Sequence, residues 1–369
     1  NYLPGVPEEV FAAHRLWGER HSGVLQAYTS WPNLPDPERR LRVAYVSPDL
    51  CEHSVARFFQ SLLDNHDHSS FEIICYADVL HPDALTTRLR QQSDRWRDCQ
   101  GWTHQQLAQR VREDGLDILI DLAGHPANIR LQVFASKPAP LQVTWLGYPN
   151  TTGIAAMDYR LTDASADPPG TTEVLYTETL VRLPGCFLSY QPSADAPAVG
   201  SLPMLSTGRV TFGSFNNLAK ITPVVIRVWS EILVALPDAR LLLKSRATGD
   251  PDVRRRLQDV FAEQGIEAGR LDFHDSVPSF HDHMAVYNQV DLALDTFPYN
   301  GTTTTCEAMW MGVPVIALAG DVHAARVGVS LLSAVGMEDY IATDTEGYVA
   351  LAVQLAHQSE RLSAVREQL

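Results

Sequence analysis

The chain has 369 residues, of which 45% are hydrophobic and 20% are charged. This length predicts about two or three domains, and the composition excludes a disordered, collagen-like or coiled-coil protein. The formal net charge of −15 opposes general attraction to nucleic acid or to an anionic membrane, so any phosphate group must be held by a local set of residues.

The sequence carries no sign of export or of a membrane span. Its longest apolar run, residues 311–320, is about half as long as the roughly 20 residues of a membrane-spanning helix. The N-terminal residues lack the apolar segment of a secretory signal. The five cysteines are widely spaced and include no Cys-x-x-Cys pair, which argues against a disulfide framework or a structural zinc site. We therefore expect a protein of the reducing cytoplasm.

The first half of the chain alternates between short β-rich runs and amphipathic helical patterns, which is typical of a parallel sheet covered by helices. A helical pattern at residues 7–23 precedes this alternation and predicts an N-terminal helical extension over residues 1–40. Strands are predicted at 41–47, 71–76, 116–121 and 141–146, and helices at 55–63 and 85–92.

A stretch rich in Pro, Ser, Ala and Gly predicts a linker at 191–208, which separates a domain at 41–190 from a second domain at 209–369. We therefore predict an α/β protein with two doubly wound, Rossmann-like domains and a cleft between the carboxyl ends of their strands, where such folds usually bind nucleotides. In the second domain we expect strands at 210–215, 240–244, 271–273, 291–294 and 313–318, and helices at 223–236, 253–264, from about 279 and from about 303.

The segment 292–310 reads as a strand, a turn containing Gly301 and a helix that opens with the hydroxyl residues Thr302–Thr305. A helix start offers unpaired N–H groups and the positive end of the helix dipole, which suits a diphosphate. Glu307, one turn later, could bind ribose hydroxyls. The alternative is an ordinary threonine N-cap before a buried helix.

Basic and acid–base candidates follow other predicted strands. Lys220 follows the first strand of the second domain and could neutralise a departing diphosphate, unless it is a solvated surface lysine; Lys244 is a weaker candidate. His53 and His125 follow strands of the first domain and could take a proton near neutral pH, or be loop histidines bonded to the backbone. Asp121 could orient a histidine or a water, or cap a turn.

Two His-Asp-His segments, at 66–68 and 281–283, resemble metal-ligand pairs only superficially, because neither has a third clustered ligand. We assign no metal site. His283 has another possible task, because an imidazole after a strand can stack on a nucleobase.

Several long motifs resemble one known family. Residues 137–153 (KPAPLQVTWLGYPNTTG), 215–220 (FNNLAK) and 294–305 (LDTFPYNGTTTT) are similar to the catalytic region of O-linked N-acetylglucosamine transferases, with bacterial homologues most alike. The resemblance runs from about residue 41 to 340. It implies a GT-B fold, inverting transfer of N-acetylglucosamine from UDP to Ser or Thr hydroxyls of proteins, and no required metal or other cofactor. From the charge and the lack of a membrane span, we expect no nucleic-acid or membrane partner.

The resemblance also implies roles for individual residues. Lys220 and Asn217 match residues at the diphosphate and nucleotide, and His283 the histidine near uracil. His53 matches a histidine discussed as the base, although a phosphate oxygen or a water chain are alternative proton acceptors. The remaining matches are Thr302, Thr303 and Thr304 at the phosphates, Glu307 at the ribose, where animal relatives often have Asp, and Phe187 and Leu188 at the acetamido pocket. Further candidates around the sugar or acceptor are Asp121, Tyr148 and His125, which stands where animal enzymes have a different residue.

Two features expected with this family fall outside residues 1–369, namely tetratricopeptide repeats before the catalytic region and a further terminal helix. Two other functions stay open. One is a cytoplasmic asparagine N-glucosyltransferase, which shares the scaffold. The other is a UDP-sugar-binding protein with little catalysis.

Overall fold

The computed structural model describes residues 5–36, 38–125, 129–275, 277 and 279–369. The chain divides into two compact units, with the division in the sequence between Gln191 and Pro192, so the predicted linker begins at the division. Residues 192–208 belong to the second unit, where Leu202 is buried.

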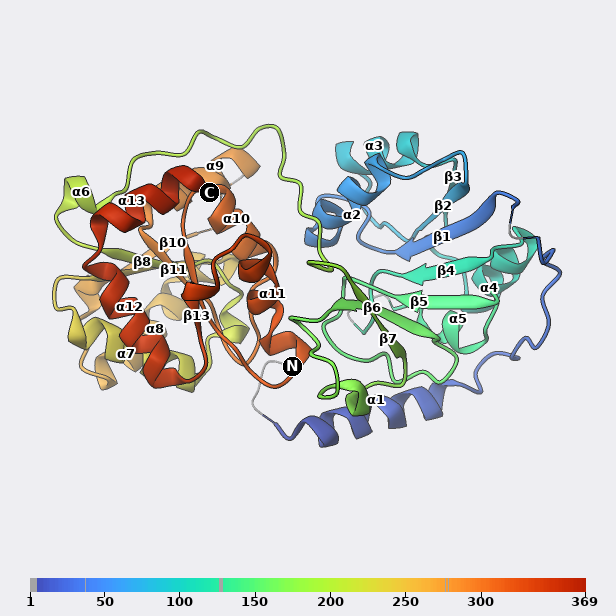
Figure 1. Cartoon of the computed structure of the whole chain (residues 1–369), viewed down its shortest axis with the longest axis horizontal. Coiled ribbons are helices and arrows are strands. Elements are labelled where there is room, and N and C mark those ends of the chain that lie inside the picture. The colour runs from blue at the N-terminus through green and yellow to red at the C-terminus, as the bar shows by residue number, and fades with distance from the viewer. Residues whose placement is uncertain (1–4, 37, 126–128, 276, 278) are drawn as a thin grey trace. The chain divides into compact units, whose positions relative to one another are not determined.

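The first unit, residues 5–191, is built on a parallel sheet with the strand order β3-β2-β1-β4-β5-β6-β7 among the described residues (Figure 1). The predicted strands and helices of this half are confirmed, with small shifts at their ends. The strands are β1 (Leu41–Ser47), β2 (Phe71–Ala77), β3 (Arg95–Asp98), β4 (Ile118–Asp121), β5 (Leu141–Thr144), β6 (Tyr159–Asp163) and β7 (Thr179–Leu183). The helices are α1 (Pro7–His21), α2 (Ser54–Asp64), α3 (Ala84–Gln92), α4 (His104–Glu113), α5 (Leu131–Ala135) and the 3-10 turn η1 (Glu173–Leu175).

The second unit carries a parallel sheet with the order β10-β9-β8-β11-β12-β13. Its strands are β8 (Thr211–Ser214), β9 (Arg240–Lys244), β10 (Leu271–His274), β11 (Leu292–Leu294), β12 (Val315–Leu318) and β13 (Ile341–Ala342). Its α-helices are α6 (Met204–Thr207), α7 (Pro223–Ala235), α8 (Pro251–Glu263), α9 (Phe280–Ala285), α10 (Thr303–Trp310), α11 (Val327–Ala334), α12 (Thr345–Ala356) and α13 (Ser359–Gln368). The 3-10 turns are η2 (Leu218–Lys220), η3 (Arg246–Gly249), η4 (Ala268–Arg270), η5 (Val286–Gln289), η6 (His323–Ala325) and η7 (Glu338–Tyr340).

Helix α7 shows how sequence pattern becomes packing in the second unit. Thr222 caps its start by accepting a hydrogen bond from Val225 N, and Pro223 occupies the first turn, where its missing N–H costs nothing. Apolar residues recur at helical spacing, and Trp229 is fully buried. Both sheets are covered in this way, which leaves the loops at the carboxyl ends of the strands to carry chemistry. Among the described residues, no helix combines the length and the apolar character needed to cross a membrane.

Helix α1 is docked on the first unit through glycine. A Cβ at Gly18 would lie 1.9 Å from the carbonyl oxygen of Gly153, so the two backbones approach closely only without that side chain. We expect Gly18→Ala to lower the free energy of unfolding by about 1–3 kcal/mol, because overpacking of this size forces the backbone to shift.

Chemical denaturation measures this effect. Gly23→Ala is the matched control, since a Cβ at Gly23 meets no atom within 4 Å. Equal stabilities of the two variants would show that α1 is not held by this contact.

Candidate active site

Three loops converge at the carboxyl edge of the second sheet. Strand β8 pairs in parallel with β9 on one side and with β11 on the other, so the residues that follow these strands emerge at one edge. The loop after β8 carries Asn216, Asn217 and Lys220, β9 ends in Lys244, and the segment after β11 leads into α10. This edge collects the residues that the sequence predicted to bind a nucleotide.

The segment after β11 is folded around the carboxylate of Asp295. One oxygen of Asp295, Oδ1, accepts hydrogen bonds from Thr296 N at 2.8 Å and from Gly301 N at 2.6 Å. Asn300 Nδ2 donates to Thr296 O at 3.0 Å, and Asn300 Oδ1 accepts from Gly328 N at 3.1 Å. The turn before α10 is therefore held from inside by side chains.

Helix α10 starts without a side-chain cap. Thr302 occupies the N-cap position, but its side chain accepts no hydrogen bond from the first turn. The alternative interpretation, an ordinary threonine N-cap, is therefore wrong for this helix. Thr303 and Thr304 are half-buried, and Thr304 Oγ1 donates to Asn216 Oδ1 at 3.2 Å. The first N–H groups of a helix have no partner within the helix, so this start can receive an anion.

Lys220 lies against the same segment. Its Nζ donates to Asn300 O at 2.7 Å and sits 4.0 Å from the centre of the Tyr299 ring. Burial lowers the pKa of Lys220 to about 8, partly opposed by the charge of Asp295. Lys220 is thus not the freely solvated surface lysine that the sequence left open, but an ammonium group fixed beside the start of α10.

The fold places the neighbours Asn217 and Asn216 differently. Asn217 is exposed and uses its side chain to accept from Ala219 N at 3.0 Å, which caps η2. Asn216 is buried, and its Nδ2 donates to Asp295 at 3.3 Å. Sequence reasoning missed Asn216 and Asp295, although Asp295 directly follows a strand in the motif at 294–305, which was the available signal.

A second cluster joins β9, α9 and α10. Lys244 Nζ lies 2.5 Å from Nδ1 of His283, and Nε2 of His283 lies 2.8 Å from Glu307 Oε2. Because an ammonium can only donate, Nδ1 accepts and Nε2 carries the proton that is donated to Glu307. Both ring nitrogens are thus engaged, so a nucleobase would meet His283 through its ring face. The predicted weaker candidate, Lys244, belongs to this cluster.

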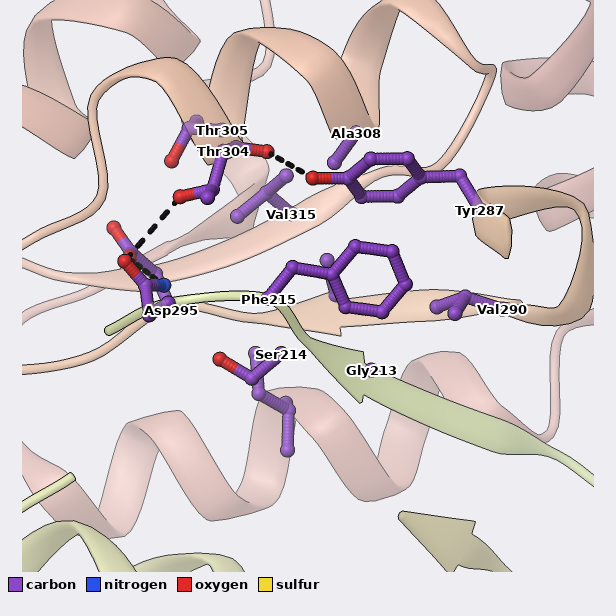
Figure 2. Close-up of a pocket in the computed structure, with 13 residues that line it drawn as sticks. Gly213, Ser214, Phe215, Tyr287, Val290, Asp295, Thr304, Thr305, Ala308 and Val315 are labelled. Atoms are coloured by element: carbon purple, nitrogen blue, oxygen red, sulfur yellow. Dashed lines mark hydrogen bonds between the residues drawn. The ribbon is translucent and has the colours of Figure 1, made fainter. Parts of the chain in front are cut away.

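Aromatic side chains line the pocket beside this cluster. The single proton of Tyr287 OH is shared between two acceptors, Glu307 Oε2 and Thr304 O, each at 3.2 Å, and the centres of the Phe215 and Tyr287 rings lie 4.2 Å apart. Figure 2 shows these two rings facing each other, with Thr304 between Tyr287 and Asp295. The pocket is lined by residues from the end of β8 and from α10. Tyr287 contacts both Thr304 and Glu307, so the cluster around His283 adjoins the residues around Asp295.

In the first unit, His53 is exposed at the N-cap of α2, and its Nδ1 accepts from Val55 N at 3.2 Å. In this arrangement Nε2 carries the proton. Asp121 is buried and accepts from Ala123 N, Gly124 N and Thr144 Oγ1, and burial raises its pKa to about 6. Asp121 therefore caps the turn after β4, which is the second of the two roles that the sequence left open for this residue.

His125 and Tyr148 pack together beneath α1. Nε2 of His125 bonds to Thr152 O at 2.8 Å, its ring meets Trp17 edge-on at 4.7 Å, and burial lowers its pKa. Tyr148 OH lies 2.7 Å from Nε2 of His14. The contribution of α1, through His14 and Trp17, was not foreseen from the sequence, because no local pattern links residue 14 to residue 148.

Phe187 and Leu188 follow β7. Phe187 is buried, and its backbone is fixed on both sides, by Asp163 on the N–H and by Trp145 Nε1 on the carbonyl. Leu188 is half-buried and its N–H faces Cys186 Sγ at 3.4 Å. These two residues stay predicted sugar contacts.

Within the described part of the chain, no three His, Cys, Asp or Glu side chains gather as metal ligands. The two His-Asp-His segments are used otherwise. His66 bonds to Tyr45 OH, His68 to Asp94, and His283 to Lys244 and Glu307.

Comparison with known proteins identifies similar sequences along almost the whole chain. The profile of glycosyl transferase family 41 matches residues 23–191 and 201–369. The chain is 47% identical, over its full length, to the Arabidopsis thaliana protein named probable UDP-N-acetylglucosamine--peptide N-acetylglucosaminyltransferase SPINDLY, and covers 41% of it. Over 90% of its length, the chain is 32% identical to a second Arabidopsis thaliana protein, named probable UDP-N-acetylglucosamine--peptide N-acetylglucosaminyltransferase SEC, and it covers 34% of that protein.

Among solved structures, a mutant of the Thermobaculum terrenum O-GlcNAc transferase is similar over 98% of this chain and 68% of its own, with a TM-score of 0.93 and 41% identity. This match, together with the two parallel-sheet units, confirms the predicted GT-B fold class. The chain spans between about a third and two fifths of the length of the curated relatives named above.

Proposed function

The chain belongs to glycosyl transferase family 41, and from that premise we propose that it transfers N-acetylglucosamine from UDP-N-acetylglucosamine to Ser or Thr hydroxyls of proteins. The relatives' names supply the donor and the peptide acceptor. The observation that carries the proposal for this chain is the Lys220 ammonium group, held on Asn300 O beside the uncapped start of α10.

The diphosphate of the donor binds between Lys220 and the start of α10, with Thr302, Thr303 and Thr304 adding hydroxyl donors. Breaking the bond between sugar and phosphate leaves negative charge on the departing UDP. Donors fixed in advance at that charge stabilise the transition state more than the ground state. An ammonium group already anchored on a carbonyl loses little freedom in this task.

Glu307 and His283 bind the nucleoside end in this proposal. The Glu307 carboxylate binds ribose hydroxyls, His283 presents its ring face to uracil, and Asn217, at the N-cap of η2, lies next to the nucleotide. The residues of the first unit, His53, His125, Tyr148, Phe187 and Leu188, contact the sugar or the acceptor, while Asp121 supports them. Asp121 acts there by shaping the turn after β4.

His53 contacts the substrate as a hydrogen-bond donor in this account. Its Nδ1 is occupied by Val55 N–H, so the neutral ring offers Nε2–H and cannot also accept a proton at Nε2. Taking the acceptor's proton at Nδ1 would break the cap of α2. A phosphate oxygen of the donor is then the better proton acceptor. His53→Ala should weaken binding more than it slows a single turnover, and the reverse pattern would restore the base role.

We also propose that transfer inverts the anomeric configuration, as the family resemblance implies. Transfer needs no metal in this proposal, because Lys220 and the start of α10 supply the positive charge at the diphosphate. Labelled UDP-N-acetylglucosamine, a Ser/Thr-rich protein extract and EDTA test this together, with hydrolysis and transfer scored separately and Lys220→Ala as the control. Label in protein despite EDTA supports the proposal, and the anomeric configuration of the product tests inversion. Transfer only with added metal would contradict metal independence.

A panel of donors and acceptors in the same assay separates the other functions. Transfer from UDP-glucose to an Asn-x-Ser/Thr peptide would identify an asparagine N-glucosyltransferase. Preference for a GDP-linked sugar would overturn the proposed donor. Tight UDP binding without transfer from any donor would identify a binding protein.

Glu307→Gln tests the nucleoside end. The substitution keeps the shape but removes the charge that accepts from both His283 and Tyr287. We expect the Kd for UDP to rise about tenfold or more, since hydrogen bonds to charged groups contribute about 1.5–3 kcal/mol, with a smaller effect on the single-turnover rate. Glu263→Gln, at the exposed end of α8, is the control for calorimetric titration. Unchanged UDP affinity would remove Glu307 from the site.

A further inference from the structure

We propose that Asp295 is a positioning residue for the donor diphosphate, which fixes the turn before α10 and so holds Lys220 in place. This inference rests on the proposed function, because it concerns the same diphosphate site. Neither the resemblance nor the comparisons assign a role to this residue.

Asp295 is placed to shape the turn. It directly follows β11 and is 2% exposed. Its Oδ1 collects three donors from three places in the chain, namely Thr296 N, Gly301 N and Asn216 Nδ2. These bonds bring the two ends of the segment 296–301 to one oxygen atom. The carbonyl group of Asn300, immediately before Gly301, is thereby turned toward Lys220.

The shape of the turn does not explain why residue 295 has a second carboxylate oxygen, Oδ2, whose burial is unfavourable. Among the described residues, Oδ2 is buried and has no hydrogen-bond partner. An asparagine could present the same Oδ1 to the same N–H groups without burying a charge, and an unpaired buried charged atom is strongly unfavourable. A residue that breaks the usual rule of satisfied buried polar groups points to a functional requirement.

Asp291, at the opposite end of β11, shows the contrast. It is also fully buried, but both of its oxygens are used, with Oδ1 accepting from Met204 N and Oδ2 from Thr211 N, each at 2.8 Å. Asp291 is therefore explained by backbone hydrogen bonds. The two carboxylates that flank β11 therefore differ: hydrogen bonds to the backbone account for Asp291, but they do not account for the charge of Asp295.

The charge of Asp295 acts on the ammonium group of Lys220. The charge of Asp295 raises the pKa of Lys220 against the stronger effect of burial, and Lys220 in turn lowers the pKa of Asp295, which burial raises to about 6. Within the described residues, Tyr348 of α12 is a further titratable group beside Asp295; its OH donates to Asp295 O at 2.9 Å, and burial raises its pKa well above its usual value. Tyr348 is thus neutral, so the pair depends on Lys220 and Asp295 themselves.

The sign of the pH effect follows from this pair. With a pKa of about 8, Lys220 is charged at neutral pH and loses its proton as the pH rises past that value. Without the carboxylate, burial acts alone, and the proton is lost at a lower pH. A neighbouring opposite charge can shift a pKa by about 1–3 units, and a shift of this size can be measured.

The experiment compares Asp295→Asn with the wild-type chain and with the control Asp291→Asn. The chain has three lysines, Lys137, Lys220 and Lys244, so the rate of amine acylation at each can be followed against pH by peptide mass spectrometry. We expect the midpoint of Lys220 labelling to fall by about one pH unit or more in Asp295→Asn, with the midpoint of Lys137 unchanged. Asp291→Asn should lower stability and leave the midpoint of Lys220 where it is.

Activity gives a second readout. The alkaline limb of kcat/KM, which reports the free enzyme, should move to lower pH by the same amount as the labelling midpoint, and UDP should bind about tenfold more weakly at pH 8. An unchanged labelling midpoint with folded protein would overturn the role of Asp295. Failure of the proposed function looks different, because a wild-type chain that binds no UDP or transfers no sugar would still show the labelling shift.

Discussion

Lys220→Ala should lower the turnover number for sugar transfer by about 100- to 1,000-fold, the effect of removing one fixed donor from a site where negative charge develops. The loss should appear in single turnovers with saturating donor, since the missing interaction is strongest once the phosphate is departing. Binding of the intact donor should weaken less than catalysis. Rapid quenching of a single turnover measures the chemical step directly.

The control is Arg227→Ala, which removes an exposed cation from α7 of the same unit, where Arg227 pairs only with the exposed Glu231 within the described residues. This variant should retain wild-type turnover, because surface ion pairs of this kind contribute little. If Lys220→Ala matched Arg227→Ala in single-turnover rate, the assignment of Lys220 to the leaving diphosphate would be wrong.

Gly301→Ala should reduce the affinity for UDP by about 10- to 100-fold. A Cβ at Gly301 would lie 2.5 Å from Thr304 Oγ1 and 3.0 Å from the side-chain oxygens of Asn216 and Asp295. The methyl group must push these atoms out of place, and overpacking of this kind costs about 1–3 kcal/mol. Because Gly301 N is also bonded to Asp295, the strain falls on the turn that presents Asn300 to Lys220.

Calorimetric titration of UDP checks this expectation. Gly269→Ala is the matched control, since a Cβ there meets no atom within 4 Å and the residue lies on η4 of the same unit. Thermal unfolding of both variants distinguishes a local change from loss of the fold. Wild-type UDP affinity in folded Gly301→Ala would contradict binding at this turn.

The alternation of strands and helices was readable from the sequence because it depends on local apolar spacing. Strand β9 was predicted at its observed bounds, and α7 and α10 at their observed starts. Strand β3 was missed because its sequence, Arg95–Asp98, has no apolar alternation and it forms through pairing with β2. Strands β6 and β7 were also missed, because they form at one edge of the sheet through parallel pairing that no local sequence pattern predicts.

The candidate site divides in the same way. Strand ends locate Lys220, Thr302 and Glu307, because position after a strand is a local property. The buried partners are not local, since Asn216 meets Asp295 across 79 positions of the chain. Asn216 was missed for the same reason, because two adjacent asparagines are distinguishable only when the fold buries one of them. The individual ligand roles came from the family resemblance and not from spacing.

The central claim is that a nucleoside diphosphate binds at the carboxyl edge of the second sheet between Lys220 and the start of α10. A crystal structure of the chain with UDP tests it most directly. The account predicts a phosphate oxygen within hydrogen-bond distance of Lys220 Nζ and others at the N–H and hydroxyl groups of Thr303 and Thr304, with the ribose at Glu307. UDP bound elsewhere, with Lys220 still on Asn300 and α10 unoccupied, would contradict it.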